Sequence, residues 1–164
     1  MAPSPDVLSS KNSDHVSQTC KAYNIAPEQF KELRQRSVEA KSVAYCPYSN
    51  FRVGCALLTA DDSIVTGANI ENASYPVGTC AERVTIGKAV TEGHRGKFKV
   101  IAVATDISPP ASPCGMCRQL YVHPDALGML YFESARLTSA QHPRVLRLDD
   151  ARLDVRPEPG LRGA

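Results

Sequence analysis

Apolar and polar positions alternate along the chain in two different periods. After Pro27, apolar or small residues recur at the three- and four-residue spacing of one helix face, and this helix should end before Pro47. Residues 51–58 and 63–70 are rich in Val, Ile, Leu and small residues, and the Asp61-Asp62 pair between them favours a turn. This pattern predicts one surface helix followed by a β-hairpin.

Three further elements are expected in the second half of the chain. A helix should run from Thr79 to Gly93, a strand buried on both faces from Val100 to Ala104, and a helix from Cys114 to about Tyr121. The order helix, strand, strand, helix, strand, helix predicts an α/β fold in which helices pack on the faces of a mixed β-sheet. Gly54 and Gly67 fall inside the hairpin strands and indicate a bulge or a close approach there, with a ligand as one candidate neighbour.

The two ends of the chain differ in composition from the segment between them. Residues 1–23 are rich in Ser, Pro, Asn and charge, which predicts a mobile tail before a core at 24–121. Residues 122–164 contain Arg but no Lys. Met129–Glu133 and Val145–Leu148 are candidates for short strands that complete the sheet.

Length and composition limit the function classes. A chain of 164 residues, 43% hydrophobic and 22% charged, is long enough for one packed core. The formal charge of +2 is too small to indicate a nucleic-acid or membrane partner, and no apolar run approaches the ~20 residues of a membrane span. Six Cys without an apolar leader segment predict reduced thiols and a cytoplasmic protein.

Three cysteines occur in a pattern suited to a metal. Cys114 and Cys117 are separated by two residues, so both sulfurs can lie on one side of a first helical turn, and Cys80 would supply a third thiolate from another helix start. Three protein ligands leave one position of a tetrahedral Zn²⁺ open for water, as in catalytic zinc sites. A C-x-x-C pair alone also occurs in redox motifs and structural zinc sites.

Glu82 has two interpretations. Thr79 and Glu82 match the Thr-x-x-Glu capping box, and taken alone Glu82 fits that cap best. Two positions from Cys80, it can instead face the open position of the metal as a proton carrier. The combined C-x-E and P-C-x-x-C pattern is a signature of zinc-dependent deaminases, and it favours the catalytic interpretation.

The segment from about Tyr45 to Gln119 resembles the small homotetrameric cytidine deaminases that act on free nucleosides. The resemblance rests on the two cysteine motifs and on two further stretches, Ala44-Tyr45-Cys46-Pro47-Tyr48-Ser49-Asn50-Phe51 and Gly67-Ala68-Asn69-Ile70-Glu71-Asn72-Ala73-Ser74-Tyr75. It implies a cytidine deaminase-like three-layer fold, a homotetramer, and hydrolysis of cytidine and 2′-deoxycytidine in pyrimidine salvage.

The resemblance also implies a role for each matching residue. Cys80, Cys114 and Cys117 would bind zinc and Glu82 would shuttle protons. The ribose 3′-hydroxyl would be bound by Asn69 and Glu71. Phe51 would pack on the pyrimidine, the backbone of Ala81 would contact the base edge, and Tyr75 would reach a neighbouring subunit's site.

The resemblance weakens after Gln119, because the sequence motifs with which the family continues its third helix, adds two strands and closes with a helix are not found in residues 120–164. A diverged tail, a splice product and an altered reading frame all fit this change. Two rival functions stay open at this point: a catalytically impaired relative with a structural zinc site, and a deaminase of a polynucleotide or another aminopyrimidine.

Overall fold

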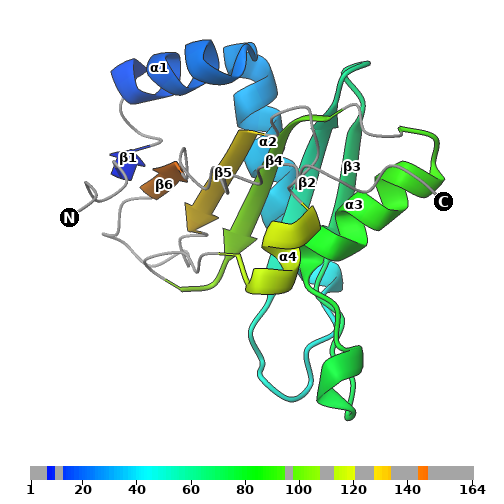
Figure 1. Ribbon diagram of the computed structural model, residues 1–164. Helices are drawn as coiled ribbons and strands as arrows, with labels where there is room; N and C mark the ends of the chain where they lie inside the picture. Colours follow the sequence, from blue (N-terminus) through cyan, green and yellow to red (C-terminus); the bar gives the residue numbers. More distant parts are fainter. Residues whose placement is uncertain are drawn as a thin grey trace, which may run out of the picture.

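A computed structural model describes residues 7–9, 13–94, 98–107, 113–120, 128–133 and 144–147 (Figure 1). Their elements follow the order β1 (Val7–Ser9), α1 (Ser13–Tyr23), α2 (Pro27–Ala40), η1 (Lys41–Val43), β2 (Val53–Thr59), β3 (Ile64–Ala68), η2 (Tyr75–Val77), α3 (Ala81–Thr91), β4 (Phe98–Thr105), α4 (Gly115–Leu120), β5 (Gly128–Glu133) and β6 (Arg144–Arg147).

The strands form one mixed sheet in the order β1-β6-β5-β4-β2-β3. β2 pairs antiparallel with both β3 and β4, whereas β4 and β5 are parallel. A parallel pair needs a crossover connection, usually a helix, and α4 lies in the connection between β4 and β5. The mixed sheet and the helices on it are therefore as predicted from the sequence.

Two separate apolar clusters show that both faces of the central strands are covered. One cluster joins α1 and α2 to one face, through Cys20, Ile25, Phe30, Leu33, Ala56, Leu58, Val100, Ala102 and Ala104. The other joins α3 to the opposite face, through Cys55, Leu57, Val65, Ala81, Ile86, Ala89, Ile101 and Val103. Successive residues of β2 and β4 alternate between the clusters, since side chains of a strand point to opposite faces. The result is three layers, with α3 and α4 on one side and α2 on the other (Figure 1).

The prediction of a mobile tail over residues 1–23 is wrong for Ser13–Tyr23, which forms α1. Val16, Thr19, Cys20 and Tyr23 follow the spacing of one helix face; Thr19 and Cys20 are buried, and Val16 and Tyr23 pack against the first cluster. Val7–Ser9 pairs with β6. The sequence did not predict this helix because two of the four residues on its buried face are a threonine and a cysteine, which give a weak apolar signal.

The remaining elements lie close to their expected positions. β5 and β6 fall within one residue of the two expected strands. Helix α3 ends at Thr91, and the expected glycine follows just beyond it: Gly93 has a φ of +102°, which suits glycine. The amides of Gly93 and His94 donate to the carbonyls of Val90 and Ala89. Within the described residues, no helix is both long and apolar enough to cross a membrane.

Gly54 marks a close approach between β2 and α2. A Cβ atom at Gly54 would lie 2.1 Å from the carbonyl oxygen of Ser37 and 2.7 Å from the backbone nitrogen of Lys41. The close approach expected from the sequence is confirmed, and the neighbouring atoms belong to the end of α2 and to η1.

We expect Gly54→Ala to destabilise the protein by about 1–3 kcal/mol or more, because backbone atoms must shift to admit the methyl group. Gly87→Ala is the matched control, since a Cβ there meets nothing within 4 Å. Urea denaturation of both variants checks this. Equal unfolding midpoints would show that α2 does not pack on β2 as described.

Candidate metal centre

The first thiol of the predicted site stands at the start of α3. Cys80 is the N-cap residue, with φ −66° and ψ 152°. Thr79, just before it, exchanges two backbone hydrogen bonds with Ile70, at 2.8 and 2.9 Å. Ile70 lies two residues after the end of β3, and Thr79 lies two residues before the start of α3. The bridge between them therefore ties the start of α3 to the β2–β3 hairpin.

The other two thiols belong to the start of α4. Cys114 directly precedes the helix and Cys117 lies in its first turn. The amide of Cys117 donates to the sulfur of Cys114 at 3.4 Å, and the amide of Arg118 donates to the carbonyl of Cys114 at 3.0 Å. The short C-x-x-C spacing and the helical turn therefore place both sulfurs on one side, as predicted.

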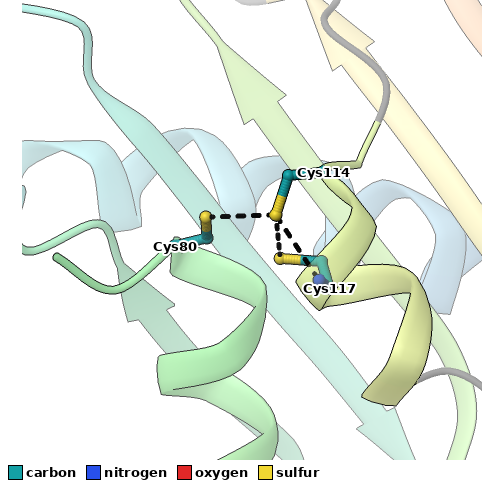
Figure 2. Close-up of side chains that lie close together, drawn as sticks. All are labelled: Cys80, Cys114 and Cys117. Carbon is teal, nitrogen blue, oxygen red and sulfur yellow. Dashed lines mark hydrogen bonds between the residues drawn. The ribbon is translucent and has the colours of Figure 1, made fainter. Parts of the chain in front are cut away.

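The two helix starts bring all three sulfurs together (Figure 2). The sulfur atoms of Cys80 and Cys114 are 3.7 Å apart, those of Cys114 and Cys117 are 3.4 Å apart, and all three lie within 4.8 Å of one another. Zinc–sulfur bonds of about 2.3 Å in a tetrahedron require sulfurs about 3.8 Å apart. The donor set and its spacing fit a Zn²⁺ bound by these three residues.

A cation from α3 faces this cluster. Arg83 donates from Nη2 to the carbonyl of Gly78 at 2.9 Å and lies 3.9 Å from the sulfur of Cys80. Arg118, in α4, instead donates from Nε to the carbonyl of Pro113 at 3.0 Å. Arg83 is thus the arginine placed to offset the negative charge of a three-thiolate zinc centre.

The pKa values of Cys80 and Cys117 shift in opposite directions. A hydrogen bond from Cys117 is the main cause that lowers the pKa of Cys80 to about 5, and Arg83 acts in the same direction against the effect of burial. The hydrogen bond to Cys80 raises the pKa of Cys117, and burial adds to this. Cys80 therefore ionises more readily than Cys117, which keeps its proton unless a metal displaces it.

Glu82 lies in the first turn of α3 and is 6% exposed. Burial raises the pKa of its carboxyl group. The capping-box interpretation is wrong: the N-cap is Cys80, the amide of Thr79 is bonded to Ile70, and the hydroxyl of Thr79 donates to the carbonyl of Val77 at 3.3 Å. A buried carboxyl group two residues from a metal ligand thus has no capping role.

The side chains predicted to bind ribose take part in a local network. Asn69 accepts from the amide of Val53 at 2.9 Å and donates to the carbonyl of Phe51 at 2.8 Å. One carboxylate oxygen of Glu71 accepts from the amides of Tyr48 and Ser49, at 3.0 and 3.2 Å. The structure therefore places Asn69, Glu71 and Phe51 together around one loop, residues 44–52.

Ser49 belongs to the same network but was not singled out in the sequence. Its hydroxyl accepts from the amide of Phe51 at 3.0 Å, and a hydrogen bond from Ser49 is the first cause that lowers the pKa of Glu71. A serine in a loop carries no periodic signal, so spacing alone gave no reason to choose it.

Ala81 and Tyr75 have contrasting environments. Ala81 is fully buried as the first residue of α3, next to Cys80. Tyr75, in η2, is 93% exposed and takes no part in the thiol cluster.

These features define a zinc-binding α/β protein in which two helix starts share one metal centre. A family model described as the cytidine and deoxycytidylate deaminase zinc-binding region matches residues 27–132. The chain belongs to this family.

Comparison with individual proteins agrees with that membership. The chain is 50% identical over 88 residues to a cytidine deaminase of Halalkalibacterium halodurans, which covers 54% of this chain and 66% of the relative. It is 45% identical over 96 residues to a probable cytidine deaminase of Dictyostelium discoideum, covering 58% and 65%. The chain thus spans slightly less than two thirds of the length of these curated relatives.

A solved structure and a more distant relative complete the comparison. The crystal structure of cytidine deaminase from Burkholderia pseudomallei superposes with a TM-score of 0.63 at 37% identity, over 71% of this chain and 91% of the other. A blasticidin-S deaminase of Bacillus cereus is 33% identical over 107 residues, covering 61% of this chain and 75% of the relative.

We expect one Zn²⁺ per chain, and its loss on changing Cys114 or Cys117 to Ala, because two remaining thiols make a poor tetrahedral site. Cys46→Ala is the matched control, since Cys46 lies outside the cluster. Elemental analysis of the dialysed proteins measures this. Full zinc content in the Cys114 and Cys117 variants would show that the metal binds elsewhere.

Proposed function

We propose that this chain carries the catalytic centre of a cytidine deaminase, which hydrolyses cytidine and 2′-deoxycytidine to uridine and 2′-deoxyuridine with release of ammonia. The main support is the buried Glu82 beside a cluster of three thiols, which among the described residues is one ligand fewer than a closed tetrahedral zinc site takes. The cytidine deaminases among the relatives and solved structures support the same substrate class.

A bound Zn²⁺ would supply a water ionised near pH 7 as the nucleophile. Glu82 takes a proton from this water and gives it to N3 of the cytosine ring, which makes C4 more electrophilic. In the second half of the reaction Glu82 takes the remaining proton from the hydroxyl group added at C4 and gives it to the amino group, which leaves as ammonia as the C4–N bond breaks. Water and cytidine are thereby converted to uridine and ammonia, and Glu82 ends in its starting state.

The loop 44–52 and its partners would bind the nucleoside. Phe51 packs on the pyrimidine, the backbone of Ala81 contacts the base edge, and Asn69 and Glu71 hydrogen-bond the ribose 3′-hydroxyl. Asn69 and Glu71 can hydrogen-bond the ribose while keeping their contacts to the loop. An amide has two donor hydrogens and a carboxylate about four acceptor sites, and the loop uses only some of them. The same contacts that hold the loop therefore also orient the ribose-binding groups.

We also propose a homotetramer in which Tyr75 approaches a neighbouring copy's site. Large apolar side chains on the segments around η2 are exposed, namely Tyr45, Tyr48, Ile70, Tyr75 and Val77. Exposed apolar groups gathered on neighbouring segments are typical of a surface that another chain covers. A cytoplasmic role in pyrimidine salvage is proposed with it, supported by six cysteines that are all free thiols.

A deaminase of another aminopyrimidine is the second candidate, because the chain is also similar to a blasticidin-S deaminase. The zinc chemistry of the site would be the same for such a substrate. Turnover of blasticidin S with none of cytidine would favour this candidate.

Glu82→Gln should keep fold and zinc but lower kcat roughly 10²- to 10⁴-fold, since proton transfer by a positioned group contributes about that much. Glu92→Gln, at the exposed end of the same helix, is the control and should leave kcat unchanged. Ammonia release from cytidine measures both. Unimpaired turnover by the Glu82 variant would remove Glu82 from the mechanism.

The ribose contacts are best tested on the substrate side, because changing Asn69 or Glu71 would also disturb the loop. Removal of a hydroxyl that a site is built to bind leaves buried polar groups unpaired, and it commonly lowers kcat/KM by roughly 10⁴-fold. We therefore expect 3′-deoxycytidine to be a poor substrate. A cytosine inside a short oligonucleotide should also be poor, because its 3′-phosphodiester adds charge beside Glu71.

This is measured as kcat/KM for cytidine, 3′-deoxycytidine and the oligonucleotide under one set of conditions. Similar values for all three would rule out the ribose role of Asn69 and Glu71 and the preference for free nucleosides, whatever the zinc content.

A further inference from the structure

One carboxylate joins the two ends of the loop that carries Phe51. Asp106 follows directly on β4, which pairs with β2 through Val53 and Thr105. Its Oδ1 lies 2.6 Å from Nζ of Lys41, in η1 before the loop. Its Oδ2 lies 2.9 Å from Nε of Arg52, at the end of the loop, and Nη2 of Arg52 lies 3.3 Å from Oδ1.

The two cations that Asp106 binds differ in burial. The side chain of Lys41 is 5% exposed and that of Asp106 is 18% exposed, whereas that of Arg52 is 54% exposed. A buried ammonium needs a paired charge, so Lys41 places Asp106 firmly. Asp106 in turn holds the exposed Arg52, which follows Phe51 in the chain.

The middle of the loop is held from another side. Asn69 and Glu71 bind the backbone between Tyr48 and Val53, as described above. Those contacts come from the exit of β3, while Asp106 comes from the exit of β4. The loop is therefore attached to both neighbours of β2 in the sheet, and Asp106 supplies the attachment of its ends.

We propose that Asp106 is a positioning residue that holds the loop 44–52 closed, so that Phe51 is already placed for the pyrimidine ring before substrate binds. This inference rests on the proposed nucleoside function. Asp106 acts through Lys41 and Arg52 and does not touch substrate. Placement before binding lowers the cost of ordering the loop, so its loss should weaken binding more than it slows chemistry.

The chain offers a matched control for this role. Asp62, in the turn at the opposite end of β2, also pairs with a lysine, Nζ of Lys99 at 2.6 Å, and accepts from the side-chain amide of Gln29 at 2.7 Å. Asp62→Asn removes a carboxylate–lysine pair of the same length, more exposed than the one at Asp106, far along the strand from Phe51. Any effect shared by both variants is a general effect of losing a paired carboxylate.

The experiment compares Asp106→Asn with Asp62→Asn in the zinc-loaded protein. We expect Asp106→Asn to raise KM for cytidine roughly tenfold while kcat changes by less than about twofold, since misplaced binding groups act mainly on ground-state binding. Zinc content should stay at the wild-type value, and Asp62→Asn should leave both constants unchanged.

A second variant guards against poor folding of Asp106→Asn. Arg52→Gln removes only the exposed partner and should raise KM by roughly threefold. An unchanged KM in a folded Asp106→Asn, or in Arg52→Gln, would overturn the inference. So would equal effects of the Asp106 and Asp62 variants.

Amide hydrogen exchange separates this inference from the proposed function. Exchange at residues 48–53 should be faster in Asp106→Asn than in Asp62→Asn, whether or not cytidine is turned over. Absence of turnover by the wild-type protein together with this faster exchange would refute the function but keep the positioning role. Unchanged exchange at these residues would refute the positioning role itself.

Discussion

The meeting of three sulfur atoms between the starts of α3 and α4 is the constraint on which the site depends. Sulfurs 3.4 and 3.7 Å apart are close enough to share one ion. Three thiolates at these distances would repel one another, and only a bound cation with help from Arg83 relieves this. The opposite pKa shifts of Cys80 and Cys117 have the same origin. When no ion is bound, a negative charge on Cys80 makes a second negative charge on Cys117 unfavourable.

The sheet explains how two distant helix starts come to the same place. β3 leads through the Ile70–Thr79 bridge to Cys80, and β4 leads through its crossover connection to Cys114. β2 lies between β3 and β4, and its first residue, Val53, is bonded to Asn69. The metal centre and the loop 44–52 are thus built on the ends of three adjacent strands, so the packing of α2 on β2 at Gly54 supports both.

Much of the fold could be predicted from the sequence because its signals are local. The hairpin, the buried strand and the ends of α3 follow from periodicity, turn residues and a glycine. The pair Cys114 and Cys117 follows from a short spacing, whereas Cys80 was added because the C-x-E motif is part of the deaminase signature. In α1 the stripe of Val16, Thr19, Cys20 and Tyr23 is too weakly apolar to stand out from its polar surroundings.

The contacts that hold the loop could not be predicted, because they join residues far apart in the chain. Asp106 lies 65 residues from Lys41 and 54 from Arg52, and no spacing rule connects such positions. The capping box predicted from Thr79 and Glu82 was wrong for a related reason. The amide that Glu82 would have capped is bonded to Ile70, a partner that only the folded sheet supplies.

X-ray absorption at the zinc K edge of the metal-loaded protein tests the open three-thiol centre most directly. The account predicts three sulfur neighbours at about 2.3 Å and one lighter donor, oxygen or nitrogen, at about 2.0 Å. Four sulfur neighbours would mean a closed structural site with no position for water, and would contradict the account.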